Sequence, residues 1–223
     1  MDEYTLRKAT RDDVNFLADV VISAEKSGTD KLSFATIFDL SETQAKEYIV
    51  AMFKEEIDGC ELSVSSFIIA GYMGNPVAAL GGWVETLNED VMASSILKAN
   101  LINYTFGKDA IAQLKTRADS IKELVSEREP LTLQLEYLYV LNEHRGKGIF
   151  NMLIAELEKQ AVCVYPELTK VQLQVYVNNF SAIKVYERNG FVITRLYKTN
   201  YAAVLNLLPY HEKYLMEKKI KIK

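Results

Sequence analysis

Cysteine and histidine are scarce in this sequence. Its 223 residues include two cysteines and two histidines. Cys60 and Cys163 lack the short spacing of metal ligands, and two cysteines do not make a disulfide framework. Since nothing in the sequence points to a metal centre, we predict no bound metal.

Long apolar runs and a strong excess of one charge are absent as well. No run of about 18 apolar residues occurs, which argues against a membrane-spanning helix. The stretch MDEYTLRKATRDD is too polar for a signal peptide. The formal net charge of −4 argues against wholesale binding to nucleic acid. These absences predict a cytoplasmic protein with neither a membrane nor a nucleic acid as its partner.

What is present is the composition of an ordinary globular protein. Hydrophobic residues make up 49% of the chain and charged residues 25%, close to the averages for soluble domains. A chain of this length can bury one sizeable core, and no internal repeat or low-complexity tract divides it. We predict a single domain spanning residues 1–223.

The first part of the chain predicts strands and helices in alternation. One helix is expected at Thr10 and Asp13, which are set as a capping box. Another is expected to begin after Ser41, with Gln44 three residues on, because this pair has the same spacing. The predicted strands are residues 4–10, 65–73 and 77–85.

Residues 88–129 interrupt this rhythm and predict a helical insertion. One helix is expected over about residues 92–104. A second helix carries an apolar stripe that recurs in steps of three and four residues. The stripe consists of Ile111, Leu114, Ala118, Ile121 and Val125.

The remainder of the chain again alternates. The predicted strands are residues 131–141, 170–177, 191–199 and 210–220, and the predicted helices lie at about 148–162 and within 178–191. This order of elements predicts an α/β (α+β) fold.

The segment Arg145–Gly148, here called the glycine turn, joins a predicted strand to a helix. The first amides of a helix lack internal partners and lie at the positive end of its dipole. Gly146 and Gly148 let a ligand approach the backbone, and Arg145 and Lys147 add positive charge. The combination favours a phosphate or pyrophosphate site, although by itself such a segment is as often a simple turn. It matches neither the P-loop nor the dinucleotide motif.

The wider sequence resembles the GNAT superfamily of acetyl-CoA-dependent N-acetyltransferases. In that family a Q/R-x-x-G-x-G/A turn binds the coenzyme A pyrophosphate through backbone amides. Here this segment reads Arg145-Gly146-Lys147-Gly148-Ile149-Phe150. The family motif N-x-x-A-x-x-x-Y-x-x-x-G-F follows as Asn179, Ala182, Tyr186, Gly190 and Phe191. One departure is Phe150, where the family usually has Gly or Ala.

The resemblance implies a mixed, mostly antiparallel sheet flanked by helices, with the helical insertion between the third and fourth strands. It implies acetyl-CoA as co-substrate, with the pantetheine arm paired to the backbone at the end of the strand before the glycine turn. The implied cofactor contacts are Leu138, Tyr139, Val140, Arg145, Gly146, Lys147, Gly148, Ile149, Phe150 and Asn179. The side chains of Leu138 and Val140 are also candidates for the core.

Two residues are candidates for proton transfer. Tyr186 matches the family tyrosine that protonates the departing thiolate, although alone it could be a core tyrosine. Glu136 is expected on the same strand face as Leu138, and it could deprotonate the amine. Family members differ at this position, so a surface or hydrogen-bonded glutamate is the plainer interpretation. Glu85 is a second candidate base, and His144 is more simply a solvated loop residue.

The prediction is therefore an N-acetyltransferase that moves an acetyl group to a primary amine of a small molecule or peptide by direct attack. The alternatives are a non-catalytic CoA-binding regulatory module and an acyltransferase with another acyl-CoA or acceptor type. The insertion could pack on its own domain, wall the acceptor site, or form a contact in a homodimer.

Overall fold

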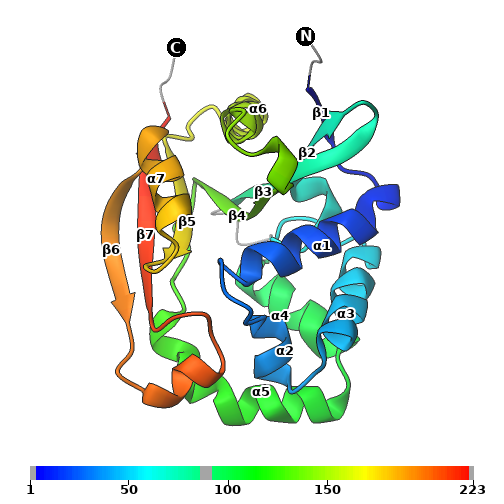
Figure 1. Cartoon of the computed structure of the whole chain (residues 1–223), viewed down its shortest axis with the longest axis vertical. Coiled ribbons are helices and arrows are strands. Elements are labelled where there is room, and N and C mark those ends of the chain that lie inside the picture. The colour runs from blue at the N-terminus through cyan, green and yellow to red at the C-terminus, as the bar shows by residue number, and fades with distance from the viewer. Residues whose placement is uncertain (1–3, 86–91, 221–223) are drawn as a thin grey trace.

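The computed structural model describes residues 4–85 and 92–220, which form a mixed seven-stranded sheet (Figure 1). The strand order is β1-β2-β3-β4-β5-β7-β6, and within the described sheet β4–β5 is the parallel pair. The strands are β1 (Thr5–Lys8), β2 (Phe67–Tyr72), β3 (Asn75–Glu85), β4 (Thr132–Val140), β5 (Lys170–Tyr176), β6 (Val192–Lys198) and β7 (Glu212–Lys219). The prediction of a mixed, mostly antiparallel sheet flanked by helices is confirmed.

The helices begin largely where the capping residues predicted. Gln44 N donates to Ser41 Oγ at 3.2 Å, and Ser41 N donates to Gln44 Oε1 at 3.0 Å. Thr10 N donates to the Asp13 carboxylate at 2.8 Å. The helices are α1 (Val14–Glu25), α2 (Ser33–Phe38), α3 (Glu42–Lys54), α4 (Ser94–Thr105), α5 (Lys108–Ile121), α6 (Ile149–Val164) and α7 (Phe180–Arg188). None of the helices in the described ranges combines the length and the apolar character that crossing a bilayer requires.

Helix α2 was not predicted from the sequence. Its six residues make less than two turns, too few to show a helical period. The helix is instead held by packing, because Phe34 and Phe38 are buried and the Phe38 ring lies 4.4 Å from that of Phe106. Tertiary contacts therefore decide the conformation of this segment.

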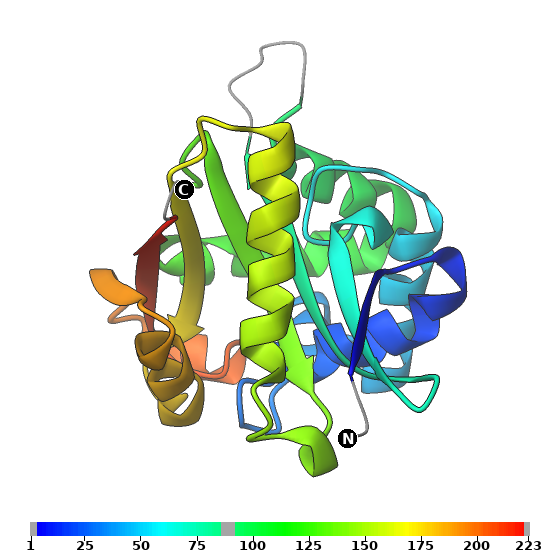
Figure 2. The ribbon, with the colours of Figure 1, turned by 90° about the horizontal axis from the view of Figure 1, so that it is seen from above.

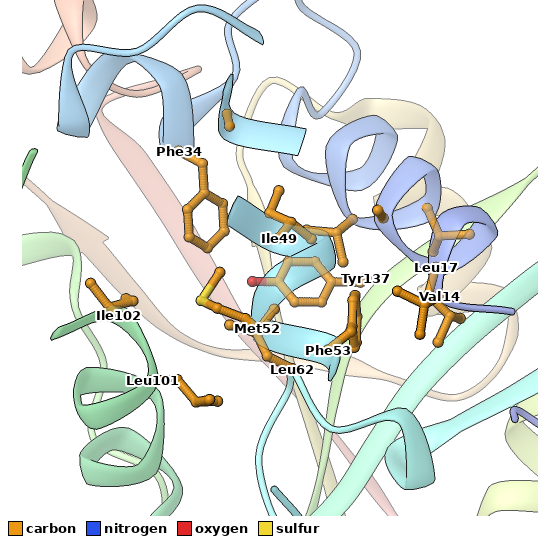
Figure 3. Packing of buried hydrophobic residues seen from close by; sticks show 14 of the residues in the cluster. Val14, Leu17, Phe34, Ile49, Met52, Phe53, Leu62, Leu101, Ile102 and Tyr137 are labelled. Carbon is orange, nitrogen blue, oxygen red and sulfur yellow. The ribbon is translucent and has the colours of Figure 1, made fainter. Parts of the chain in front are cut away.

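The two faces of the sheet bury separate cores. Phe67 and Ile69 of β2 join the core that contains α1, α2 and α3, whereas Ile68 and Ala70 join the core beneath α6. This is the alternation expected of a strand that is covered on both faces. Figures 1 and 2 show α6 on one side of the sheet and α1 on the other. Figure 3 shows the first core, with Tyr137 among its aliphatic and aromatic side chains.

A bulge at Tyr137 interrupts the alternation in β4. Gly81 pairs with Glu136, yet Ala79 pairs with Tyr139, so β4 carries one extra residue, and Tyr137 has φ of +54°. Tyr137 consequently joins the α1 side, and Leu138 packs on the α6 side.

The pairing of β4 with β5 ends early. Thr132–Leu135 pair with Lys170–Leu173, after which β4 continues beside β3 and β5 continues beside β7. Among the described residues, no strand pairs with the second edge of β4 beyond Leu135. We call this point the β4–β5 fork.

The predicted helical insertion is confirmed as α4 and α5, followed by a 3-10 turn at Lys122–Leu124; residues 88–91 lie outside the described residues. Arg117 of α5 anchors it to the rest of the chain by donating to the carbonyls of Thr36 at 2.6 Å and Ile37 at 3.1 Å. The insertion thus packs on its own domain.

The apolar stripe of the insertion is confirmed only in part. Ile111 and Leu114 pack on the core around α2 and α3, and Ile121 packs on a small cluster near β6. Val125 is 66% exposed, and Leu124 is buried in its place. The physical reason is the 3-10 turn, whose three residues per turn shift the buried position by one.

Candidate active site

The glycine turn has the geometry of an anion-binding backbone. Gly146 and Gly148 each have φ of +75°, and a Cβ added at either would meet no atom within 4 Å. Gly148 caps α6, a helix of 16 residues with no side-chain cap at its N-terminus. Within the described residues, Lys147 has no ion-pair partner. The amides at the start of α6 therefore face open space at the positive end of a long dipole.

The residues that follow the turn point inward. Ile149 and Phe150 are buried in the core beneath α6. The Phe150 ring lies 5.5 Å from the ring of Tyr186 in an edge-to-face arrangement. Phe150 thus keeps its amide at the helix start while its side chain packs below, so the departure at this position does not block the turn.

The end of β4 lies next to this turn. Leu138 and Val140 pack their side chains on the α6-side core, as expected, while Tyr139 packs on the opposite core. Arg145 Nε donates to Val140 O at 3.0 Å, which ties the turn to the strand end. The second edge of this part of β4 is unpaired by any described strand, so its backbone groups are available to an extended ligand.

Helix α7 places Tyr186 behind the turn. Asn179 caps this helix by accepting from Ala182 N at 3.3 Å, and its amide donates to Ser27 Oγ at 3.0 Å. The side-chain oxygen and nitrogen of Asn179 are therefore both hydrogen-bonded within the protein. Among the described residues, the Tyr186 hydroxyl has no hydrogen-bond partner. Burial raises the pKa of Tyr186, and the charge of Glu136 raises it further, so the phenol is a protonated donor at neutral pH.

Glu136 lies on the other side of the sheet. A Cβ at Gly82 would meet Leu157 of α6 at 3.0 Å, so its neighbour Trp83 faces away from α6. Arg128 stacks on Trp83 at 4.7 Å and lies 3.6 Å from Glu136. The expectation that Glu136 and Leu138 share a face is wrong, because the bulge at Tyr137 reverses the alternation between them.

The two candidates for proton transfer are nevertheless coupled. Tyr186 belongs to the α6 side and Glu136 to the α1 side, and the charge of one affects the pKa of the other. Burial raises the pKa of Glu136, and the repulsion of Glu61 adds to this, while Arg128 opposes it. The two candidates thus lie on opposite faces of the sheet, and Glu136 immediately follows the last β4 residue that pairs with β5.

The sequence model of the "Acetyltransferase (GNAT) family" matches residues 34–191 of this chain, which include the turn and both candidates. The chain belongs to the GNAT acetyltransferase family. The resemblance drawn from the glycine turn and the α7 motif is therefore confirmed for this GNAT protein. No curated protein matches its sequence.

Solved structures show the same fold. The N-acetyltransferase from Staphylococcus aureus Mu50 aligns with a TM-score of 0.64 and 14% identity over 96% of this chain and 99% of that one. A crystal structure of an acetyltransferase aligns with a TM-score of 0.60 and 16% identity, over 97% of this chain and 100% of that one. A GNAT-family acetyltransferase from Streptococcus pneumoniae aligns with a TM-score of 0.53 and 16% identity, over 98% of this chain and 100% of that one. At such identities the similarity concerns the fold.

Other polar residues of this GNAT protein have structural partners. Glu85 is buried and accepts from Ser94 N at 3.0 Å and Trp83 Nε1 at 3.3 Å, so it holds the start of α4. His144 Nδ1 lies 2.8 Å from the hydroxyl of Tyr4 and is half-buried. Of the two candidate bases, Glu136 and Glu85, Glu136 is therefore the better placed.

Sequence reasoning missed three charged residues next to Glu136. Lys98 and Arg128 each form an ion pair with Glu61, and Arg128 also pairs with Glu136. We call these four residues the charge cluster. Charged residues in loops and on helices are mostly solvated, and no local pattern marks Glu61 as buried or Lys98 and Arg128 as its partners.

Proposed function

We propose that this protein transfers the acetyl group of acetyl-CoA to a primary amine by direct attack. The observation that carries the proposal is the β4–β5 fork, with an open helix N-terminus and a protonated Tyr186 on one face and Glu136 on the other. Donor and acceptor would then meet where the two strands part.

The donor would bind along the α6 side. Its pyrophosphate would accept hydrogen bonds from the backbone amides of residues 146–150, with Arg145 and Lys147 adding charge. Its pantetheine arm would pair with the unpaired edge of β4 at residues 138–140, as an added strand does. Asn179 would contribute by placing α7, in addition to any direct contact.

Starting from a protonated amine, the chemistry must remove two protons from the nitrogen and supply one to the sulfur. Amines of the lysine type have a pKa near 10.4, so the acceptor arrives protonated and must lose a proton to Glu136 before or during attack. The amine nitrogen forms a bond to the thioester carbon, and the amide of Val140 or its neighbour stabilises the oxyanion. The C–S bond then breaks as the carbonyl re-forms, and Tyr186 gives its proton to the departing thiolate. The second proton of the nitrogen passes to the Tyr186 phenolate or to solvent, which leaves a neutral amide and a free thiol.

The experiment is a binding measurement followed by a turnover screen. Calorimetry should show acetyl-CoA binding, and thiol release should accelerate with at least one member of a panel of small-molecule amines and peptide amines. Binding without turnover by any amine would favour the CoA-binding regulatory module. Faster release with another acyl-CoA or with an alcohol would favour the broader acyltransferase. Absence of any binding would overturn the proposal.

A further inference from the structure

Glu61 is a buried carboxylate in the loop between α3 and β2. It is 1% exposed and accepts hydrogen bonds from Arg128 Nη1 at 3.1 Å and Nη2 at 3.0 Å. Lys98 of α4 pairs with it at 2.8 Å. Burial alone would raise the pKa of Glu61, but attraction to Lys98 and Arg128 lowers it to about 2. Glu61 is therefore ionised, and it binds two residues of the insertion.

The guanidinium of Arg128 is oriented by several partners. Its bidentate pair with Glu61 sets the plane of the group, and Trp83 lies against its face at 4.7 Å. Nη1 also donates to Ser94 Oγ at 2.8 Å. Since β3, the Glu61 loop and α4 all contribute, Arg128 has a defined position that does not depend on Glu136.

Glu136 is the outer partner of this arrangement. Its Oε1 lies 3.6 Å from Arg128 Nη2, close enough for strong attraction but longer than a hydrogen bond. The exposure of the side chains rises from 1% for Glu61 to 14% for Arg128 and 26% for Glu136. Glu61, Arg128 and Glu136 thus form a row of alternating charges that begins in the core and ends at the β4–β5 fork.

We propose that Arg128 is a positioning residue for acetyl transfer: it holds the Glu136 carboxylate at the β4–β5 fork and, through Glu61, makes that placement depend on the helical insertion. The inference rests on the proposed function, because it takes Glu136 as the base. Arg128 itself need not touch the reacting atoms.

The charges of the cluster predict in which direction the pKa of Glu136 should change in each variant. Arg128, Lys98 and Lys213 attract the Glu136 carboxylate, whereas burial and Glu61 favour its protonated form. Removing Arg128 takes away the largest attraction, so Glu136 should lose its proton only at higher pH. Removing the charge of Glu61 should act in the opposite direction, because it ends a repulsion and frees Arg128 for Glu136.

The test compares Arg128→Met with Glu61→Gln in the full chain. We would measure kcat/KM against pH with saturating acetyl-CoA and the amine that reacts fastest in the panel. Arg128→Met should move the acid limb up by about 1–3 pH units, the effect of losing an opposite charge at this range. Glu61→Gln should move it down. The KM for acetyl-CoA should be unchanged in both variants.

Arg117→Met is the matched control. Arg117 also ties the insertion to the body of the protein, through the carbonyls of Thr36 and Ile37. Among the described residues, none of its hydrogen bonds or ion pairs involves the charge cluster. This variant should lose stability and keep the parental pH profile. A shifted acid limb in Arg117→Met would show that any loosening of the insertion suffices, which would overturn the role of Arg128.

A direct titration keeps the test decisive if Arg128→Met folds poorly. Carbon-13 labelling of glutamate side chains, with Glu136→Gln to assign the signal, reports the pKa of Glu136 without turnover. Arg128→Lys retains the charge but not the bidentate geometry, so its Glu136 pKa should rise above the parental value, and an unchanged Glu136 pKa in this variant would count against the inference.

Several outcomes would overturn the inference. One is an unchanged acid limb of the pH profile in Arg128→Met. Another is a shift of the acid limb in the same direction in Arg128→Met and Glu61→Gln. A third is a Glu136 pKa that stays the same when Arg128 is replaced. If the unaltered protein acetylates no amine, the proposed function fails and this inference fails with it. Turnover with a normal Arg128→Met profile would overturn this inference alone.

Discussion

The glycine turn and the charge cluster flank the same stretch of β4 beyond the β4–β5 fork, but they are built in opposite ways. The turn is four consecutive exposed residues whose conformation two glycines permit. The charge cluster joins residues from the Glu61 loop, α4, the segment before β4 and β4 itself, and its innermost member is 1% exposed. One region is local and open, and the other is distributed around a buried carboxylate.

This difference separates binding from folding. A change in the turn alters what the backbone can hold, and the core beneath it stays packed. A change in the cluster leaves buried charge without a partner, which costs more than the pair itself contributed. Each of the following variants tests whether the two regions behave so differently.

The largest effect is expected from Gly148→Glu. A carboxylate side chain would enter the open space beside the α6 amides and repel phosphate, so acetyl-CoA binding measured by calorimetry should be lost. A non-glycine residue at φ of +75° also costs about 1–2 kcal/mol of folding stability.

Gly74→Glu separates these two effects. Gly74 has φ of +80° and is equally open, but it lies in the β2–β3 turn. It should show a similar drop in melting temperature and normal acetyl-CoA affinity. Equal binding by the two variants would place the phosphates somewhere other than the glycine turn.

Tyr186→Phe should give the next largest effect. The ring and its contacts with Phe150 and Phe191 remain, so acetyl-CoA should bind with unchanged KM. Loss of the hydroxyl should lower kcat by up to the roughly 10²–10⁴-fold typical of proton-transfer catalysis. A variant with full kcat would reduce Tyr186 to a packing residue and strengthen the case for a non-catalytic module.

Glu61→Gln should reveal the folding role of the charge cluster. The pKa of Glu61 falls from its ordinary 4.5 to about 2, a difference worth about 3 kcal/mol. Because the folded-state pKa is depressed, this stability is present above about pH 4.5 and is lost as the pH falls through about 2. The free energy of unfolding should therefore differ most between parent and variant at neutral pH.

Urea unfolding at several pH values measures this difference. Glu55→Gln is the control, because Glu55 is exposed at the end of α3, and no ion pair of it is found among the described residues. If the difference in the free energy of unfolding between parent and Glu61→Gln stays constant from pH 7 to pH 2, Glu61 is not charged in the folded protein.

The smallest effect is expected on the exposed face of α5. Lys115→Glu and Asp119→Lys change charge where the helix meets solvent. If the insertion also walls the acceptor site, acceptor KM should change by up to about fivefold, as exposed charges are worth up to about 1 kcal/mol. Acetyl-CoA affinity should not change. A flat acceptor KM together with lost self-association in sedimentation would make the insertion a dimer contact.

The parts of the fold that were predictable are those with a local cause. The Ser41–Gln44 capping box, the strand alternation of β2 and the glycine turn each depend on neighbours within a few residues. Helix α2 and the position of Leu124 depend instead on what packs against them. Their own residues carry too short a pattern to predict them.

By itself, the sequence determined the order of the elements, the family resemblance and the backbone of the glycine turn, because periodicity, capping and glycine conformation are properties of short segments. Only the tertiary structure decided that Glu136 faces away from Leu138, since one extra residue at Tyr137 reverses the faces of β4. Only the tertiary structure also brought Arg128 between Glu61 and Glu136. Burial of these charges depends on chain segments that are distant in sequence, and the energy of a charge depends on its surroundings more than on its neighbours along the chain.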